Sequence, residues 1–239
     1  AKGNAIGRKG NNTSPSPVTD GKHVWVMTGS GVLAAVTMDG AIVWSKNIQD
    51  EYGKFGLNFG YGSSPVLHDG KIFVQVLHGF KTDDPSYLAA FDALKGDLVW
   101  RAERPTDALS ETPDAYNTPA LLKVGDRMQL IVCGGGFVSG HDPKDGKEIW
   151  RSFGLDPKRD EYYRTIASAV AVDGMVYAPT RQKPLLAVRA DGKGDVSATH
   201  VAWKWDEPYG TDVPSPVCDG KYFYMVDDKG VATCTDAKT

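Results

Sequence analysis

The chain has 239 residues, 41% of them hydrophobic and 24% charged, and its formal net charge is −3. It is therefore long enough to bury a sizeable core as one or two domains. It carries no basic stripe, which excludes nucleic acid and an anionic membrane surface as electrostatically favoured partners. No apolar run approaches the roughly 18 residues of a membrane span, so the sequence predicts no transmembrane segment.

Five similar strand-turn-strand patterns are spaced along the chain. Each begins with a short opener, which is S-P-V at 16–18, 64–66 and 215–217, T-P-A at 118–120 and S-A-V at 168–170. A turn that contains glycine follows each opener, and a run such as H-V-W-V-M or K-I-F-V-Q-V comes after the turn. Short runs of β-branched and aromatic residues favour strands that are covered on both faces. Each pattern therefore predicts two paired strands.

A second hairpin follows in the first four patterns and ends at a tryptophan. Its clearest form is L-A-A-F-D-A-L-K-G-D-L-V-W at 88–100, and G-H-D-P-K-D-G-K-E-I-W at 140–150 is a second copy. The aspartate can accept a backbone N–H to start the turn, and the glycine allows the positive φ that the turn needs. The large flat indole predicts packing between successive sheets. The residues predicted to dock the sheets are Trp44, Trp100, Trp150 and Trp203, with the turn residues Asp92, Gly96, Asp142 and Gly146.

Together the two hairpins make a unit of four short strands, and the tryptophans recur every 50 to 56 residues. A repeat of this length with four strands predicts a β-propeller, in which each unit is one blade. Because blades stack on one another, residues 1–239 are expected to form a single domain. The predicted blades are 13–50, 63–104, 117–153, 166–206 and 212–239. The last one lacks its outer strand, so we expect an all-β, incomplete propeller of four complete blades and a partial fifth, taken from a ring of seven or eight.

The pattern A-x-D-x-x-x-G-x-x-x-W, here Ala90, Asp92, Gly96 and Trp100, resembles the tryptophan-docking motif of the pyrroloquinoline-quinone-like (PQQ-like) β-propellers. That family contains quinone-dependent alcohol dehydrogenases and also non-enzymatic proteins of outer-membrane assembly. The long loops, such as Y-G-K-F-G-L-N-F-G-Y-G-S-S-P, are most similar to a secreted bacterial branch that is called assembly-factor-like or BamB-like. The resemblance implies a non-enzymatic binding or scaffold protein outside the cytoplasm, either periplasmic or secreted.

The same resemblance leaves a second hypothesis, which is a quinone-dependent enzyme or a small-ligand binder. The dehydrogenases of the family hold their quinone against two adjacent cysteines, near a calcium ion. This chain has three cysteines, none adjacent to another, and no cluster in it matches the calcium ligands. We therefore predict no catalytic residue, no metal ligand and no cofactor. Under the second hypothesis, pyrroloquinoline quinone, a calcium ion or a sugar would bind at the mouth of the central channel of the propeller.

The long loops of a propeller meet on one face, where binding residues usually collect. The predicted loops are 49–62, 78–87, 103–117, 154–165, 180–184 and 206–212, and they are rich in Tyr and Arg, as recognition surfaces are. The candidate contact residues are Tyr52, Phe55, Tyr61, His78, Lys81, Tyr116, Tyr162, Tyr163, Arg164 and Arg181. A protein or peptide partner is expected there or at an exposed strand edge. The alternative is that these aromatic residues only pack over the rim of the loops.

Overall fold

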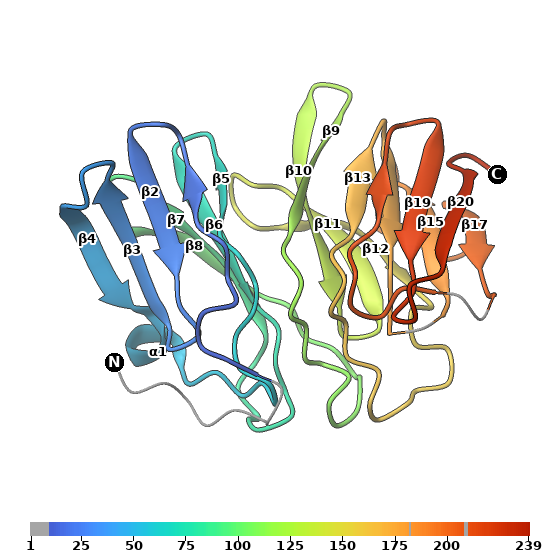
Figure 1. Ribbon diagram of the computed structural model, residues 1–239, viewed down its shortest axis with the longest axis horizontal. Helices are drawn as coiled ribbons and strands as arrows, with labels where there is room; N and C mark the ends of the chain where they lie inside the picture. The colour runs from blue at the N-terminus through green and yellow to red at the C-terminus, as the bar shows by residue number, and fades with distance from the viewer. Residues whose placement is uncertain (1–9, 182, 208–209) are drawn as a thin grey trace.

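Five successive β-sheets stand side by side like the blades of a fan in the computed structural model (Figure 1). The structure describes residues 10–181, 183–207 and 210–239, so small parts of two predicted loops, 182 and 208–209, lie outside the described residues. One short helix, α1 (Ile48–Tyr52), lies in the first long loop, where the sequence predicted no helix. The predicted all-β class and the stacked antiparallel sheets are confirmed.

Apart from one short strand, β16, the strands of each sheet follow one another along the chain and pair antiparallel. The first sheet consists of β1 (Val18–Thr19), β2 (His23–Met27), β3 (Val32–Thr37) and β4 (Ile42–Asn47). The second consists of β5 (Val66–His68), β6 (Lys71–Val76), β7 (Tyr87–Asp92) and β8 (Leu98–Glu103). The third contains β9 (Ala120–Val124), β10 (Arg127–Gly134), β11 (Phe137–His141) and β12 (Glu148–Phe153).

The fourth sheet consists of β13 (Val170–Val172), β14 (Met175–Ala178), β15 (Leu185–Arg189) and β17 (Val201–Trp205). The fifth has three described strands, which are β18 (Val217–Cys218), β19 (Tyr222–Val226) and β20 (Ala232–Asp236). The third sheet differs from the prediction of four strands, because β16 (Gly194–Asp195) pairs in parallel with the outer edge of β12. This extra strand comes from the loop before β17 and covers an edge that would otherwise be open.

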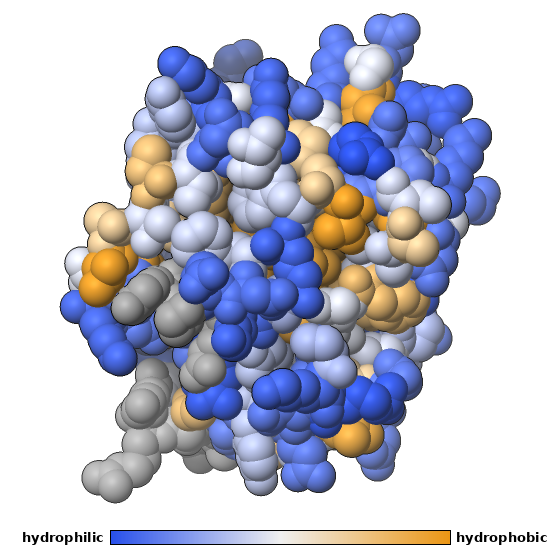
Figure 2. All heavy atoms as spheres, turned by 90° about the vertical axis from the view of Figure 1, so that its right-hand side faces the viewer, coloured by the Kyte–Doolittle hydropathy of each residue, from blue (hydrophilic) through white to orange (hydrophobic). Residues whose placement is uncertain are grey.

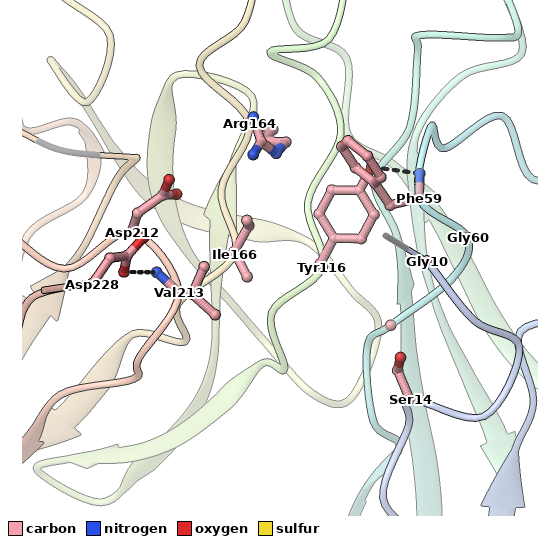
Figure 3. A pocket seen from close by; sticks show the side chains of 11 residues that line it. Gly10, Ser14, Phe59, Gly60, Tyr116, Arg164, Ile166, Asp212, Val213 and Asp228 are labelled. Carbon is pink, nitrogen blue, oxygen red and sulfur yellow. Dashed lines mark hydrogen bonds between the residues drawn. The ribbon is translucent and has the colours of Figure 1, made fainter. Parts of the chain in front are cut away.

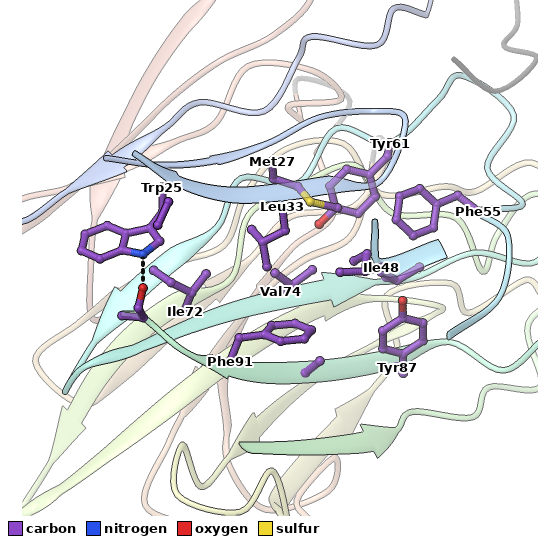
Figure 4. Packing of buried hydrophobic residues seen from close by; sticks show 14 of the residues in the cluster. Trp25, Met27, Leu33, Ile48, Phe55, Tyr61, Ile72, Val74, Tyr87 and Phe91 are labelled. Atoms are coloured by element: carbon purple, nitrogen blue, oxygen red, sulfur yellow. Dashed lines mark hydrogen bonds between the residues drawn. The ribbon is translucent and has the colours of Figure 1, made fainter. Parts of the chain in front are cut away.

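The hydrophobic core lies between the sheets, in one cluster for each neighbouring pair. Strand residues alternate between the two faces, so that Ile72 and Val74 of β6 pack toward the first sheet while Phe73 packs toward the third. Figure 4 shows the first cluster, in which Trp25 and Leu33 meet Phe91 and its neighbours. Because each sheet is buried on both faces, its strands carry the continuous apolar runs that the sequence showed.

Four tryptophan indoles reach from one sheet to the next. Trp25 of β2 donates to the carbonyl of Ala93 at 2.7 Å, and three of the predicted docking tryptophans follow the same pattern. In each case the indole N–H donates to the backbone carbonyl of the residue after the turn aspartate of the following sheet. The bonds join Trp44 to Ala93 (2.8 Å), Trp100 to Pro143 (3.1 Å) and Trp203 to Ala237 (3.1 Å). At Gly96, where φ is 74°, a Cβ atom would lie 2.7 Å from the Trp44 ring. Glycine is therefore needed at this position for two reasons: it allows the positive φ of the turn, and it leaves room for the Trp44 ring.

Trp150 is fully buried, and its indole is linked to the next sheet through the side chain of Gln129. Its indole N–H donates to Oε1 of Gln129 at 2.7 Å, and Nε2 of Gln129 donates to the carbonyl of Ala190 in the fourth sheet at 3.0 Å. A Cβ atom at Gly140, the residue opposite Trp150, would lie 2.3 Å from the indole nitrogen. Glycine thus stands here where the other sheets have alanine, because the ring lies against the backbone. How much these contacts stabilise the stack stays a prediction.

Candidate binding site at the loop face

A chain of hydrogen bonds links the openers of the five sheets. The backbone N–H of each opener residue donates to the side-chain hydroxyl of the next opener. The bonds run from Ser16 to Ser64 (2.9 Å), from Ser64 to Thr118 (3.1 Å), from Thr118 to Ser168 (3.0 Å) and from Ser168 to Ser215 (2.9 Å). This arrangement explains why each opener begins with Ser or Thr. It also fixes the segments that immediately precede the openers relative to one another.

Those preceding segments surround one pocket of about 440 Å³ (Figure 3). Residues two positions before each opener line it, which are Ser14, Gly62, Tyr116, Ile166 and Val213. The lining is completed by Gly10, Phe59, Gly60, Arg164, Asp212 and Asp228. All five repeat units therefore contribute to one pocket, and its volume lies in the range of pockets that hold ligands.

The aromatic side of the pocket is formed by Phe59 and Tyr116, whose ring centres are 6.0 Å apart. The Phe59 N–H donates to the Tyr116 hydroxyl at 3.1 Å. That hydroxyl donates in turn to the buried carboxylate of Asp114, which also accepts the backbone N–H groups of Asn58, Gly79 and Phe80. Burial outweighs these donors and raises the pKa of Asp114 to about 6. One carboxyl group thus ties three loops together behind the aromatic wall.

Charged residues continue the pocket lining from the aromatic side. Arg164 lies over the Phe59 ring at 5.2 Å, and its Nη1 is 3.6 Å from a carboxylate oxygen of the buried Glu111. Asp212 lies across the pocket, with Arg181 Nε 3.9 Å from its Oδ2. Burial raises the pKa of Asp212, whereas the charges of Arg164 and Arg181 lower it. With Asp228, which also lines the pocket and raises the pKa of Asp212, three carboxylates and two guanidinium groups lie in or beside this part of the pocket.

Of the residues predicted from the sequence, the structure brings Tyr116 and Arg164 into the pocket and Arg181 beside it. Phe55, Tyr61 and His78 lie elsewhere, because all three are buried. Phe55 stacks on Tyr61 at 4.8 Å, and Nδ1 of His78 accepts the Gly56 N–H. Their burial leaves them almost no surface for a partner. They pack inside the loop.

The remaining predicted residues lie around the rim. Tyr52 is on α1 and donates to Glu51, and Lys81 is exposed and donates to the carbonyl of Asn58. Tyr162 is exposed, while Tyr163 lines a separate, smaller pocket beside Lys183 and Asp206. None of these four side chains lines the central pocket. Whether any of them contacts a partner stays a prediction.

The sequence interpretation missed Phe59, Asp212 and Asp228, although one signal could have found part of the site. Residues two to four positions before an opener point to the pocket in several units, and Arg164 and Asp212 both fall in that window. Asp228 could not be found in this way, because it lies in the turn after β19. It reaches the pocket by accepting the Val213 N–H at 3.1 Å.

The described residues hold neither a cluster of potential metal ligands nor a helix that could span a membrane. No group of three or more His, Cys, Asp and Glu side chains in this part of the chain is arranged to hold a metal ion. No described helix is long and apolar enough to cross a membrane. The charged and aromatic groups of the pocket are suited to hydrogen bonding, ion pairing and stacking.

Stacked antiparallel sheets whose loops share one pocket define an all-β, propeller-like protein. The family model described as outer membrane protein assembly factor BamB matches residues 1–239. The chain therefore belongs to this family, and the resemblance found in the sequence is confirmed. A comparison with curated proteins found no match.

Several solved structures share the fold. BamB from Moraxella catarrhalis is 17% identical, with a TM-score of 0.63, over 94% of this chain and 58% of that one. A europium-containing methanol dehydrogenase is 17% identical, with a TM-score of 0.62, over 93% of this chain and 49% of that one. Quinohemoprotein alcohol dehydrogenase from Comamonas testosteroni is 15% identical, with a TM-score of 0.53, over 72% of this chain and 33% of that one. The chain thus spans less than two thirds of each of these proteins.

Proposed function

We propose that the protein is a non-enzymatic binding scaffold of the assembly-factor type, which works outside the cytoplasm and holds a segment of a partner protein in the loop-face pocket. The observation that carries this proposal is the convergence of all five repeat units on one pocket. Its rigid walls of Phe59, Tyr116 and Arg164 are the residue types that anchor protein partners. The family, described as an assembly factor, is a second support.

Peptide panning tests the proposal directly. A random library of displayed 12-residue peptides is selected on the purified chain, and the selected peptides are measured against variants. We expect Tyr116→Ala to weaken their binding at least tenfold, because it removes the aromatic wall of the pocket. Tyr162→Ala is the matched control, since Tyr162 is exposed on the same face and lies outside the pocket. If no selected peptide distinguishes the two variants, the pocket is not the binding site.

We also infer that the five sheets belong to a closed ring of seven or eight blades, and the fifth sheet supports the presence of a further blade. Tyr224 occupies the position of Tyr177 in the fourth sheet, since both pair with the third residue of their opener, Val217 and Val170. Tyr177 is buried and donates its hydroxyl to the carbonyl of Ala237 in the next sheet, at 2.8 Å. Tyr224 is 37% exposed and faces away from the fourth sheet. The Tyr224 side chain could therefore pack against a further blade, as Tyr177 packs against the fifth sheet.

The mass of the native protein tests the ring. A native mass well above the 25.8 kDa of these 239 residues would support further blades. A native mass of 25.8 kDa would contradict a ring closed within one chain. Cell fractionation tests the compartment in the same preparation, because the proposal places the protein in the periplasmic or secreted fraction.

A second candidate function is that of a quinone-dependent dehydrogenase-like enzyme or small-ligand binder. The fold likeness to the two dehydrogenases favours it, and so does the volume of the pocket. An absorbance spectrum and elemental analysis of the purified native protein separate the candidates. Bound quinone absorbs in the visible or near ultraviolet, and a calcium site gives stoichiometric calcium. Either result would replace the scaffold proposal with the ligand-binding one.

A further inference from the structure

The third sheet shows how a short segment of chain can cover the outer edge of a blade. The segment 194–197, which contains β16, lies along β12. The Val196 N–H donates to the C=O of Arg151 at 2.8 Å, and the Ser197 hydroxyl oxygen accepts the N–H of Phe153, also at 2.8 Å. The Val196 side chain is buried in the core cluster between the third and fourth sheets. Two backbone groups of the edge and one apolar contact therefore hold the segment.

The bound segment is folded as a tight turn. One carboxylate oxygen of Asp195 accepts both the N–H and the hydroxyl of Ser197. These hydrogen bonds, and after them the nearby charge of Arg151, lower the pKa of Asp195. Three consecutive residues, D-V-S at 195–197, therefore supply the turn, the apolar side chain and the hydroxyl that β12 binds.

The outer strand of the second sheet, β8, has the same edge chemistry as β12. V-W-R at 99–101 stands in β8 where I-W-R at 149–151 stands in β12. Arg101 and Glu103 take the register positions of the two residues that bind the segment in β12, so the C=O of Arg101 and the N–H of Glu103 face away from β7. Each arginine also pairs with one glutamate of its own strand, which is Glu148 in β12 and Glu103 in β8.

The edge of β8 is open, because the loop that would cover it is short. In the fourth unit the loop before the outer strand is 190–200, which contains β16, whereas in the third unit it is only 142–147. The outer edge of β8 pairs with no described strand. Val99 is 46% exposed, while the equivalent Ile149 packs against the cluster that contains Val196. An open edge of this kind can pair with an extended segment of another chain.

We propose that the outer edge of β8 is a second partner site, which binds a segment of another polypeptide that reads Asp-Val-Ser or Asp-Ile-Ser. The N–H of its β-branched residue donates to the C=O of Arg101, and its serine hydroxyl accepts the N–H of Glu103. Its apolar side chain covers Val99 and the outer part of Trp100, as Val196 covers the third sheet. No residue of β8 lines the loop-face pocket, so this site is separate from the one in the proposed function.

The test selects peptides from a displayed library that fixes Asp-Val-Ser at its centre and randomises four residues on either side. We expect Val99→Lys to weaken binding of the selected peptides at least tenfold, because it removes the apolar contact and forces burial of a charge. Val43→Lys is the matched control. Val43 is the equivalent residue of β4 and is 42% exposed, but Ser45 stands there in place of the arginine. This control should change binding by less than threefold.

A second measurement uses the unaltered protein and so does not depend on the folding of a variant. A peptide with N-methylated valine lacks the N–H that the C=O of Arg101 accepts, and it should bind at least tenfold more weakly. N-methylation at the first randomised position, outside the contact, should be tolerated within threefold. Equal binding of the valine-methylated and unmethylated peptides would overturn the proposal.

The remaining outcomes are equally decisive. If the library yields no binding peptide, or if Val99→Lys and Val43→Lys weaken binding alike, the edge site is overturned. Tyr116→Ala should leave binding within threefold of the unaltered protein. A tenfold loss in Tyr116→Ala without a loss in Val99→Lys would place the peptides in the loop-face pocket, which overturns the edge site and leaves the proposed function standing.

Discussion

Asp114 shows how one buried carboxyl group makes the loop face dependent on pH. Its folded pKa is raised to about 6 from an ordinary value of 3.8, mainly by burial. Stability from this group is therefore fully present below about pH 4 and is lost as the pH rises through about 6. A shift of this size corresponds to about 3 kcal/mol, at 1.36 kcal/mol per unit. We expect the advantage of the unaltered protein over Asp114→Asn in urea unfolding to shrink between pH 4 and pH 7. An advantage that grows with pH would contradict the assignment.

Arg104 is a second residue whose role follows from its contacts. It is buried, its ring-facing guanidinium lies 3.6 Å from the Phe137 ring centre, and it donates to Ser139, Gly134 and Phe137. A lysine has no planar fork and cannot serve these three acceptors together. We expect Arg104→Lys to lower the free energy of unfolding by about 2 to 4 kcal/mol. The side chain of Arg101 is 26% exposed, with one ion pair of 3.4 Å and a contact over the Tyr87 ring at 4.5 Å, so Arg101→Lys should cost under about 1 kcal/mol. Equal losses in urea unfolding would refute the argument.

At the scale of the element, the tryptophans are predicted to hold neighbouring sheets together. Trp100 and Trp150 are both buried, so replacing either by Ala should cost about 3 to 5 kcal/mol in the free energy of unfolding. Asp92→Ala should cost about 1 kcal/mol, since Asp92 accepts two backbone N–H groups in an exposed turn. Chemical unfolding monitored by tryptophan fluorescence measures all three. Losses below about 1 kcal/mol for both tryptophans would show that docking does not depend on them.

The sequence predicted the sheets because their signals are strong and repeated, as apolar runs, turn glycines and openers. It could not predict β16, whose two residues pair through backbone atoms alone and leave no side-chain pattern. It placed Phe55 and Tyr61 on the surface because their loop is long, whereas the loop folds inward and buries both. The sequence did not predict Asp212 as a pocket residue, because a single aspartate carries no signal unless its position is compared with that of the openers. Contacts that recur in every repeat unit could therefore be predicted from the sequence, whereas contacts that a single side chain makes could not.

At the scale of the whole molecule, the stack is uncovered on the outer face of the fifth sheet. Val217, Tyr222, Tyr224 and Val226 are exposed there and alternate with the buried Phe223 and Met225. Figure 2 faces this end of the molecule and shows hydrophobic side chains among the polar ones. The Phe223 face rests on the fourth sheet, whereas the Tyr224 face has the same alternation and packs against no described sheet. Such a face favours association with other proteins.

This uncovered face leads to a prediction for the 239-residue chain studied alone. We expect it to associate with itself as its concentration rises, because burying the exposed valines and tyrosines removes apolar surface from water. Val217→Lys combined with Tyr224→Lys should raise the concentration at which association begins by at least tenfold, since lysines on the face would repel one another and cost desolvation. Tyr162→Lys, a change of the same kind on the loop face, is the control and should leave association unchanged. Analytical ultracentrifugation over a range of concentrations measures all three proteins. If the double variant associates as readily as the control, self-association does not involve the outer face of the fifth sheet. The inference that a further blade packs on this face would then lose its support.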